Sequence, residues 1–370
     1  SMKKQFLFSY LIFISLFSVA QDFAKKDNFF AYKLKKISTD IYVTERSEPL
    51  RHSLEGNTVI LIRSEFVVVV DAGGSSEAAE KLIEDIKRLS SKPVKYLINT
   101  HFHGDHSFGN QAFLKAYPDI KIIATPYTTQ VITDRIKTFT PFTENDSLFE
   151  ARRVQIVEQI EQVRTSTAYT PAGKKKIIQN LERHKEHDLF TIKRVYKDLK
   201  MTPPNTIIEG KYTIQDQQGT VEVLFLGKGD TPGDAWVYLP NEKVLITGDA
   251  LPYPVPYGFT NTPVEWLQTL QKAADMQFDH LIPGHGKVLS KKEGRQYLTD
   301  VINLLQSIQE QVRNCLTQSY TLEQTIKSIN VSKEQKVLTG GDDFLNYYFD
   351  RYFGKPIIER FYNDLKSRMK

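Results

Sequence analysis

Short β-branched runs and a segment with helical spacing alternate along the first third of the chain. Residues 57–62 and 66–70 are two such runs, and the second ends in Asp71-Ala72-Gly73-Gly74. We expect a hairpin whose last strand stops at a glycine turn. Residues 76–89 place their apolar side chains on one helical face, and residues 94–98 predict a further strand. This strand runs directly into a polar motif at residues 101–106.

The middle of the chain changes from strand spacing to helical spacing and back. After a short strand predicted at 121–124, apolar residues recur at helical spacing within a long charged stretch. Strand patterns return at 220–226, 235–239, 243–246 and 280–282, and helical patterns follow from residue 291 to the end. We therefore expect one domain over residues 21–290, with a helical insertion at about 126–203, and a C-terminal helical extension over 291–370.

The first twenty residues have the pattern of a secretory signal peptide. Lys3 and Lys4 precede an apolar run at 6–17, which is followed by small residues up to Ala20. The run is shorter than the ~20 residues that span a bilayer, so we expect cleavage near Ala20 and no stable membrane anchor afterwards. Ser1 precedes Met2 and is interpreted as a cloning remnant. The expected location is the periplasm or the exterior of the cell.

Composition narrows the class of protein further. The 370 residues are 40% hydrophobic and 25% charged, which is typical of a globular chain. The net charge is +5, and removing Lys3 and Lys4 leaves about +3, which argues against a nucleic-acid partner. Cys315 is the only cysteine, so no disulfide framework is expected. These features favour a soluble exported protein that acts on a small molecule, with its oligomeric state open.

The motif His101-Phe102-His103-Gly104-Asp105-His106 contains the residue types of a metal site. A one-residue separation lets an extended backbone aim two imidazoles to the same side, and Gly104 permits the bend that turns the next two ligands toward a second ion. Two cations need ligands from several strand ends, because one short peptide cannot surround both. Asp249 and His285 each follow a later predicted strand and could complete such a site.

Together, several segments resemble the metallo-beta-lactamase superfamily over residues 41–288: HFHGDH at 101–106, DAGG at 71–74, the block at 229–249 and PGHG at 283–286. The resemblance implies an α/β fold, a four-layer αββα sandwich with metal ions at one edge between its two sheets. It also implies a first ion bound by His101 and His103, and a second bound by Asp105, His106 and His285. Asp249 would bridge both ions, and Asp71 would support the site by a hydrogen bond to a ligand.

One position departs from the family pattern. Where many members have a histidine before the TPGD sequence, this chain has Asp230. Asp230 could bind the first ion directly, bind it through water, or only cap the turn at Thr231-Pro232. A carboxylate makes the first site less selective for zinc and more hospitable to manganese or iron. We expect two divalent ions, with zinc as the default and manganese or iron as alternatives at the first site.

The resemblance also suggests a reaction class. Two cations that share a bridging water would yield hydroxide near neutral pH, and Asp105 could orient this nucleophile as a catalytic residue. Resembling sequences with a bridging aspartate include glyoxalase II types, lactonases, phosphodiesterases and ribonucleases, whereas beta-lactamases usually have Cys or Ser there. We expect hydrolysis of an ester, lactone or thioester. The alternatives are a beta-lactam-hydrolysing enzyme and a non-catalytic binding protein with a degraded metal site.

Four further residues are candidates for the substrate pocket. Tyr253, Tyr257 and Phe259 follow Asp249 in a proline-rich segment that should be stiff. They could line the pocket or simply pack against the helical insertion. Lys228 could pair with a substrate carboxylate or could be an ordinary surface lysine.

The remaining histidines have simpler interpretations. His184 and His187 are three residues apart in the charged stretch, where a solvated helix face is favoured over a metal site. His280 is expected to be structural, and His52 lies in a loop with no assignment.

Overall fold

The computed structural model describes residues 29–48, 50–51, 55–141 and 144–369. The signal peptide expected at 1–20, the interpretation of Ser1 and the loop position of His52 lie outside these ranges and stay predictions. Within them, no helix is both long enough and apolar enough to cross a membrane.

Two β-sheets form the centre of the fold. The seven-stranded sheet has the order β1 (Lys33–Ser38), β2 (Ile41–Glu45), β3 (Val59–Ile62), β4 (Val67–Val70), β5 (Val94–Ile98), β6 (Lys121–Ala124), β7 (Thr206–Ile207). The six-stranded sheet has the order β13 (Leu289–Ser290), β12 (His280–Pro283), β11 (Val244–Gly248), β10 (Trp236–Leu239), β9 (Val221–Leu224), β8 (Lys211–Ile214). The expected hairpin is the antiparallel pair β3 and β4.

Four of the strands that precede residues of the predicted site run parallel in pairs, two in each sheet. β4 pairs with β5 in parallel, and β11 pairs with β12 in parallel. The carboxyl ends of parallel neighbours emerge at the same edge of a sheet. The loops after these four strands can therefore converge on one place.

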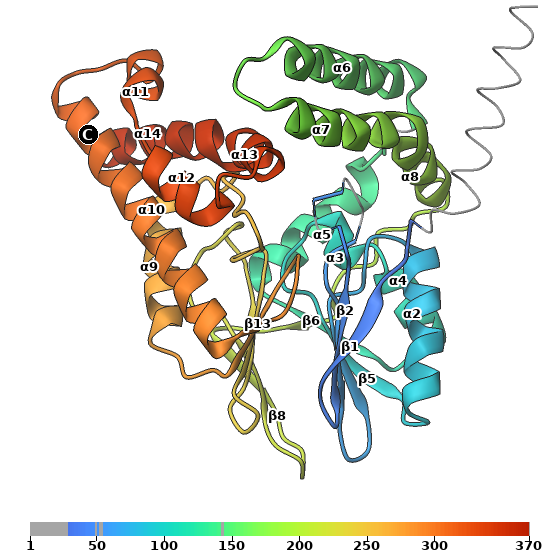
Figure 1. Ribbon diagram of the computed structural model, residues 1–370. Helices are drawn as coiled ribbons and strands as arrows, with labels where there is room; N and C mark the ends of the chain where they lie inside the picture. The colour runs from blue at the N-terminus through green and yellow to red at the C-terminus, as the bar shows by residue number, and fades with distance from the viewer. Residues whose placement is uncertain (1–28, 49, 52–54, 142–143, 370) are drawn as a thin grey trace, which may run out of the picture.

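Helices cover the outer face of each sheet and complete four layers. α2 (Ser76–Leu89) and α4 (Asn110–Ala116) pack on the seven-stranded sheet, while α9 (Pro263–Ala274) and α10 (Lys291–Thr317) pack on the six-stranded sheet (Figure 1). The αββα sandwich implied by the resemblance is thus confirmed.

The apolar pattern of β3 explains why the sheet is buried on both faces. Val59 and Leu61 belong to the core between the two sheets, whereas Ile60 and Ile62 pack under α2 and α4. All four side chains are buried. Alternate residues of a strand point to opposite faces, so a continuous apolar run suits a strand that has a layer on each side.

Further helices lie beyond the edge where the loops converge. The chain leaves the sheet after β6 and returns at β7, and between them it forms α5 (Pro126–Thr138), α6 (Asp146–Thr165), α7 (Pro171–Arg183), the π-helix η2 (His184–Asp188) and α8 (Leu189–Tyr196). The C-terminal region adds α11 (Leu322–Ser328), α12 (Ser332–Thr339), α13 (Asp343–Phe349), the π-helix η3 (Asp350–Gly354) and α14 (Lys355–Arg368). In Figure 1 the green α6 and α7 and the red α13 lie above the sheets.

These two sets of helices share one apolar cluster. Tyr347 and Tyr348 of α13 are buried together with Ile156 of α6 and Leu181 of α7. The Tyr348 hydroxyl also accepts a hydrogen bond from the side chain of Asn180. The inserted and C-terminal helices are therefore packed as one body over the sheet edge.

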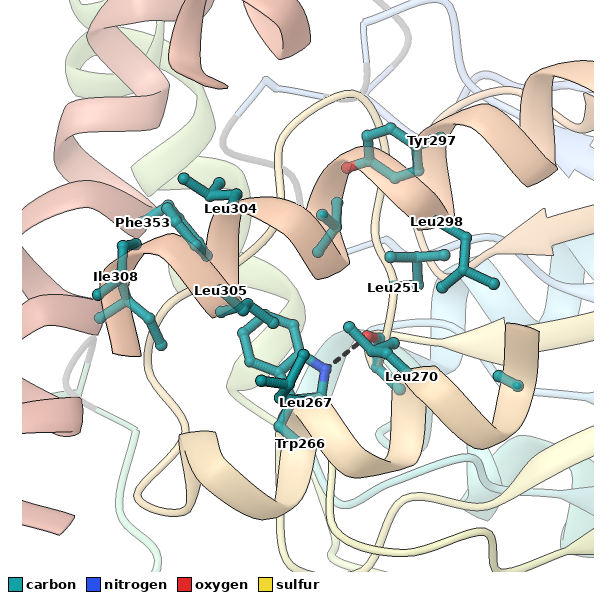
Figure 2. Packing of buried hydrophobic residues seen from close by; sticks show 14 of the residues in the cluster. Leu251, Trp266, Leu267, Leu270, Tyr297, Leu298, Leu304, Leu305, Ile308 and Phe353 are labelled. Carbon is teal, nitrogen blue, oxygen red and sulfur yellow. Dashed lines mark hydrogen bonds between the residues drawn. The ribbon is translucent and has the colours of Figure 1, made fainter. Parts of the chain in front are cut away.

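Trp266 of α9 ties the outer helical layer to the loop after β11. Its side chain is fully buried among Leu267, Leu270 and Phe353, and its indole N–H donates to the carbonyl of Ala250 at 2.9 Å (Figure 2). Ala250 directly follows Asp249, so this bond fixes the backbone beside a candidate metal ligand.

We expect Trp266→Phe to lower the free energy of unfolding by about 1–3 kcal/mol, because it leaves a buried carbonyl without its donor. Chemical denaturation monitored by circular dichroism measures this. Trp236→Phe is the matched control, since the buried indole N–H of Trp236 has no hydrogen-bond partner within the described residues. Equal losses in the two variants would contradict a role for the Ala250 bond.

Candidate metal centre

The seven ligand candidates lie together at the edge where the strand-end loops converge. His101 follows β5, Asp249 directly follows β11, and His285 follows β12. Asp105 and His106 belong to the short helix α3 (Gly104–Ser107), and Asp230 lies in the loop between β9 and β10. The structure therefore brings together residues that are up to 184 positions apart, from His101 to His285.

Two groups of ligand atoms can be distinguished, and Asp249 belongs to both. The first consists of His101, His103, Asp230 and Asp249, and the second of Asp105, His106, Asp249 and His285. Within each group the ligand atoms lie within 4.8 Å of one another. Apart from Asp230, whose role the sequence left open, these are the two sets that the family resemblance implies.

The spacing of the first group suits a shared cation. The Nε2 atom of His101 is 2.9 Å from Nδ1 of His103 and 3.8 Å from Oδ2 of Asp249. Nδ1 of His103 is 3.4 Å from Oδ2 of Asp230. Ligand atoms about 2.1 Å from a tetrahedral ion lie about 3.4 Å apart, so these atoms need little movement to surround one.

The second group is equally close. The Nε2 atoms of His106 and His285 are 3.3 Å apart. Oδ2 of Asp105 is 3.3 Å from the first of these nitrogens and 3.0 Å from the second. Asp249 completes the group with Oδ1 at 3.4 Å from His106 and Oδ2 at 3.4 Å from His285.

Two glycines are required for this close approach. A Cβ atom at Gly284 would meet Oδ1 of Asp249 at 2.1 Å, and one at Gly56 would meet the His106 ring at 2.4 Å. Neither the carboxylate nor the ring could retreat without leaving its group. In the PGHG motif, His285 is a ligand candidate and Gly284 leaves room for the carboxylate of Asp249.

Asp71 orients the imidazoles by hydrogen bonds. Its Oδ2 lies 2.8 Å from Nδ1 of His106 and accepts a bond from the Thr100 hydroxyl at 2.9 Å. That hydroxyl is in turn 3.0 Å from Nδ1 of His101. A proton on each Nδ1 leaves each Nε2 lone pair directed into the centre, which is the arrangement a metal ligand needs. The supporting role implied for Asp71 has a geometric basis here.

We expect Asp71→Asn to weaken metal binding by about 10- to 100-fold. Asparagine presents an amide N–H to His106, which favours the tautomer whose Nε2 carries the proton. It also tolerates the left-handed backbone of Asp71, whose φ is +64°, so the change adds little strain. Titration against a competing chelator measures the affinity. Unchanged affinity would show that Asp71 does not set the tautomer.

Asp230 is buried without polar support. It is 6% exposed, and neither carboxylate oxygen makes a hydrogen bond within the described residues. The turn is capped instead by Asp234, whose carboxylate accepts bonds from the backbone N–H and the hydroxyl of Thr231. Asp230 therefore does not cap the turn, which was one of the three roles left open by the sequence. A buried carboxylate that accepts no hydrogen bond is stabilised by a nearby cation.

The charges of the first group suit a bound cation. Burial, followed by the charges of His106 and His103, holds the pKa of His101 well below its usual range, so this imidazole is neutral as a ligand must be. Burial and the negative charges of Asp234 and Asp249 raise the pKa of Asp230 well above its usual range. A divalent ion would supply the positive charge that this carboxylate lacks. The residues present therefore fit a two-metal centre.

The centre opens into a cavity of about 250 Å³. Two of the four predicted pocket residues, Tyr257 and Phe259, line it, and Phe259 is 45% exposed. The ring of Tyr257 lies against His285, with centroids 5.8 Å apart. The full lining among the described residues is Leu50, Arg51, His103, Asp105, Asp230, Asp249, Tyr257, Phe259, His285 and Tyr352.

Tyr253 and Lys228 are not among these lining residues, so the pocket alternative is wrong for both, and Lys228 fits the other alternative of an ordinary surface lysine. Tyr253 packs edge-to-face on Tyr297 of α10, so it contacts the C-terminal region rather than the insertion. Lys228 is a half-exposed surface lysine 3.7 Å from Glu265.

Arg51 and Tyr352 line the cavity but were not predicted from the sequence. Arg51 lies in the loop after β2, and Tyr352 lies in η3 of the C-terminal region. The Tyr352 ring stacks on Tyr348, with centroids 5.4 Å apart. Neither residue belongs to a recognisable motif, although the tail is rich in aromatic residues.

The expected solvated helix face is wrong for His184. Its side chain is 3% exposed, because η2 turns it toward Asp188 inside the insertion. Burial lowers the pKa of His184 to about 4. His187 is partly exposed, and the metal-ligand groups found among the described residues contain neither histidine. His280 lies in β12, away from these groups.

Comparison with known families agrees with this geometry. The family model described as the metallo-beta-lactamase superfamily matches residues 54–285, which is more than half of the chain. The chain belongs to the metallo-beta-lactamase superfamily. The αββα sandwich of this chain is the fold of that superfamily, and the match covers all seven ligand candidates.

Relatives within the superfamily include sulfatases. A linear primary-alkylsulfatase of Pseudomonas sp. is 23% identical over 301 residues, which are 77% of this chain and 51% of the relative. The solved structure of the stereoselective inverting sec-alkylsulfatase Pisa1 from Pseudomonas sp. is 18% identical, with a TM-score of 0.61, over 90% of this chain and 50% of that one. A metallo-beta-lactamase from Pontibacter korlensis is 18% identical, with a TM-score of 0.50, over 75% of this chain and 99% of its own. This chain spans about half the length of the alkylsulfatases.

Proposed function

We propose that this superfamily member is a metal-dependent hydrolase of esters that carry an apolar organic group. The observation that carries the proposal is Asp249, whose carboxylate belongs to two four-ligand groups beside one cavity. Two divalent ions bound there, with zinc as the default, would supply a hydroxide nucleophile near neutral pH and polarise the oxygen under attack.

The protein's own residues would prepare the attack. Asp105 lines the cavity, and its Oδ2 lies 3.0 Å from Nε2 of His285. Its carboxylate can orient an attacking water and hold one of its protons. Tyr257, Phe259 and Tyr352 present rings to the same cavity, which suits the apolar part of a substrate and excludes bulk water from it.

The first candidate substrates are sulfate esters of alkyl alcohols. The alkylsulfatase relatives support this choice, and the aromatic wall suits an alkyl chain. Carboxylic esters, lactones and thioesters form a second class, which is the one expected from Asp249 in the sequence. Manganese or iron in place of zinc at the first group is supported by the carboxylate of Asp230.

The test combines metal analysis with a substrate panel. The purified chain is reconstituted with zinc, manganese or iron and assayed on hexyl sulfate, hexyl acetate, a lactone, a thioester and a chromogenic cephalosporin. We expect two metal equivalents and turnover of one ester class, lost on chelation. Turnover of the cephalosporin alone would replace this proposal with beta-lactam hydrolysis. Fewer than two equivalents and no turnover would indicate a non-catalytic binding protein.

We also propose export to the periplasm or the exterior, which the pattern of residues 1–20 supports. Mass spectrometry of the chain recovered from the expressing cell should find a mature end near residue 21. An intact Met2 in the cytoplasm would contradict it.

A further inference from the structure

Arg51 lies in the wall of the cavity and is bonded there to the helical insertion. Its Nη2 donates to Oδ1 of Asp188 at 2.6 Å, and its Nε lies 3.3 Å from each oxygen of the same carboxylate. Asp188 ends η2 and is fully buried. The insertion therefore fixes the guanidinium in one place beside the metal-ligand groups.

The surroundings of Arg51 are those of an interior residue. Its side chain is only 7% exposed, and its guanidinium carbon lies 5.2 Å from the centre of the Phe29 ring. The preceding residue, Leu50, is buried in the apolar cluster formed by the inserted and C-terminal helices. An ordinary surface arginine would not be held from both sides in this way.

The charges around the cavity indicate why an arginine is needed there to bind an anion. Three carboxylates line it, those of Asp105, Asp230 and Asp249, so two divalent ions would leave a net charge of only +1 before any hydroxide is counted. An anionic substrate group therefore gains little from the net charge of the metal centre. Among the described lining residues, Arg51 alone carries a permanent positive charge. A guanidinium with a fixed orientation binds oxyanions through charge-assisted hydrogen bonds.

We propose that Arg51 binds an anionic oxygen group of the substrate, so that the chain prefers esters with a negative charge, such as sulfate monoesters, over uncharged esters. Asp188 acts as the positioning residue. The inference rests on the proposed function, because it takes the bound molecule to be a substrate. Binding of the anion can still be measured without any turnover.

The test measures equilibrium binding of three probes to the metal-loaded chain by calorimetry: 1-hexanesulfonate, hexanoate and 1-hexanol. Removing Arg51 alone would leave the buried carboxylate of Asp188 with only His187 and His184 beside it among the described residues, so the comparison is between the unaltered chain and the double variant Arg51→Gln with Asp188→Asn, which removes both charges of the pair. We expect the double variant to bind hexanesulfonate about 10- to 150-fold more weakly than the unaltered chain, with equal affinity for hexanol. Lys228→Gln, which removes a cation outside the cavity, is the control that should change neither.

Three results would overturn the proposal: hexanesulfonate bound no more tightly than hexanol by the unaltered chain, hexanesulfonate affinities within about threefold in the unaltered chain and the double variant, or an equal loss for hexanol. A parallel loss for hexanoate would support Arg51 as a receptor for anionic oxygen groups in general. Because these are binding measurements, a chain that hydrolyses no ester but shows the expected difference would refute the proposed function and leave the role of Arg51 intact.

Discussion

Asp249→Ala should abolish hydrolysis while leaving the fold intact. The carboxylate of Asp249 is the one ligand common to both groups, so its loss opens both metal sites together. Burial acts to raise the pKa of this carboxyl, but the charges of His285 and His106 outweigh it and hold the pKa well below its usual range. The side chain is therefore ionised and available to bridge cations. Losing several kcal/mol of transition-state stabilisation corresponds to a fall in kcat of about 10³-fold or more.

Three measurements test this expectation. Steady-state kinetics on the active ester gives kcat, metal analysis of the dialysed variant gives the stoichiometry, and far-ultraviolet circular dichroism checks the fold. Asp249→Asn serves as the variant of matched size, and it should also lose activity because a neutral amide cannot balance two cations. Turnover within tenfold of the unaltered chain would refute the bridging assignment.

Asp230→Ala should reduce the metal content from two equivalents to one. The first group would keep two imidazoles and the shared Asp249, one ligand fewer than the second group, so its ion should be the one lost on dialysis against a chelator. We expect a fall in kcat of about 10²- to 10³-fold, because a two-metal site stabilises charge at both ions.

Asp230→His separates the ligand role from other effects of the substitution. It restores the three-imidazole first site common in the superfamily and should hold two zinc ions with a weaker preference for manganese. Asp119→Ala, which removes an exposed carboxylate, is the control and should retain both ions. Two tightly held ions in Asp230→Ala would mean that Asp230 is not a ligand.

The ligand groups were predictable because their residues follow strongly apolar strands. β11 is a continuous buried run, and β5 ends on the buried pair Leu97 and Ile98. The motif after β5 carries ligands at a spacing that an extended chain can aim together. Helix α2 was likewise predicted at its observed bounds, since its apolar residues repeat with helical spacing. By contrast, β1 and β8 were not predicted, because both are partly exposed and rich in polar residues.

The cavity wall could not be predicted from the sequence in the same way. Arg51 and Tyr352 are 301 positions apart and meet only through the packing of the insertion against α13. His184 was assigned to a solvated face because its neighbours are charged, yet η2 shifts the helical register and turns it inward. Lys228 and Tyr253 were proposed from closeness in sequence to ligands, which says nothing about the direction of a side chain. Long-range contacts decide all of these positions.

The shared apolar cluster of the inserted and C-terminal helices has a consequence for how this protein can diversify. The ligands come from the strand ends of the sandwich, whereas Arg51 and Tyr352 are held by helices outside it. Changes among those helices can reshape the cavity while the sheet edge that gathers the ligands stays as it is. Exchanging the outer helices between homologues should therefore replace Tyr352 and the Asp188 that holds Arg51, and so alter the cavity, while the metal-ligand groups stay unchanged.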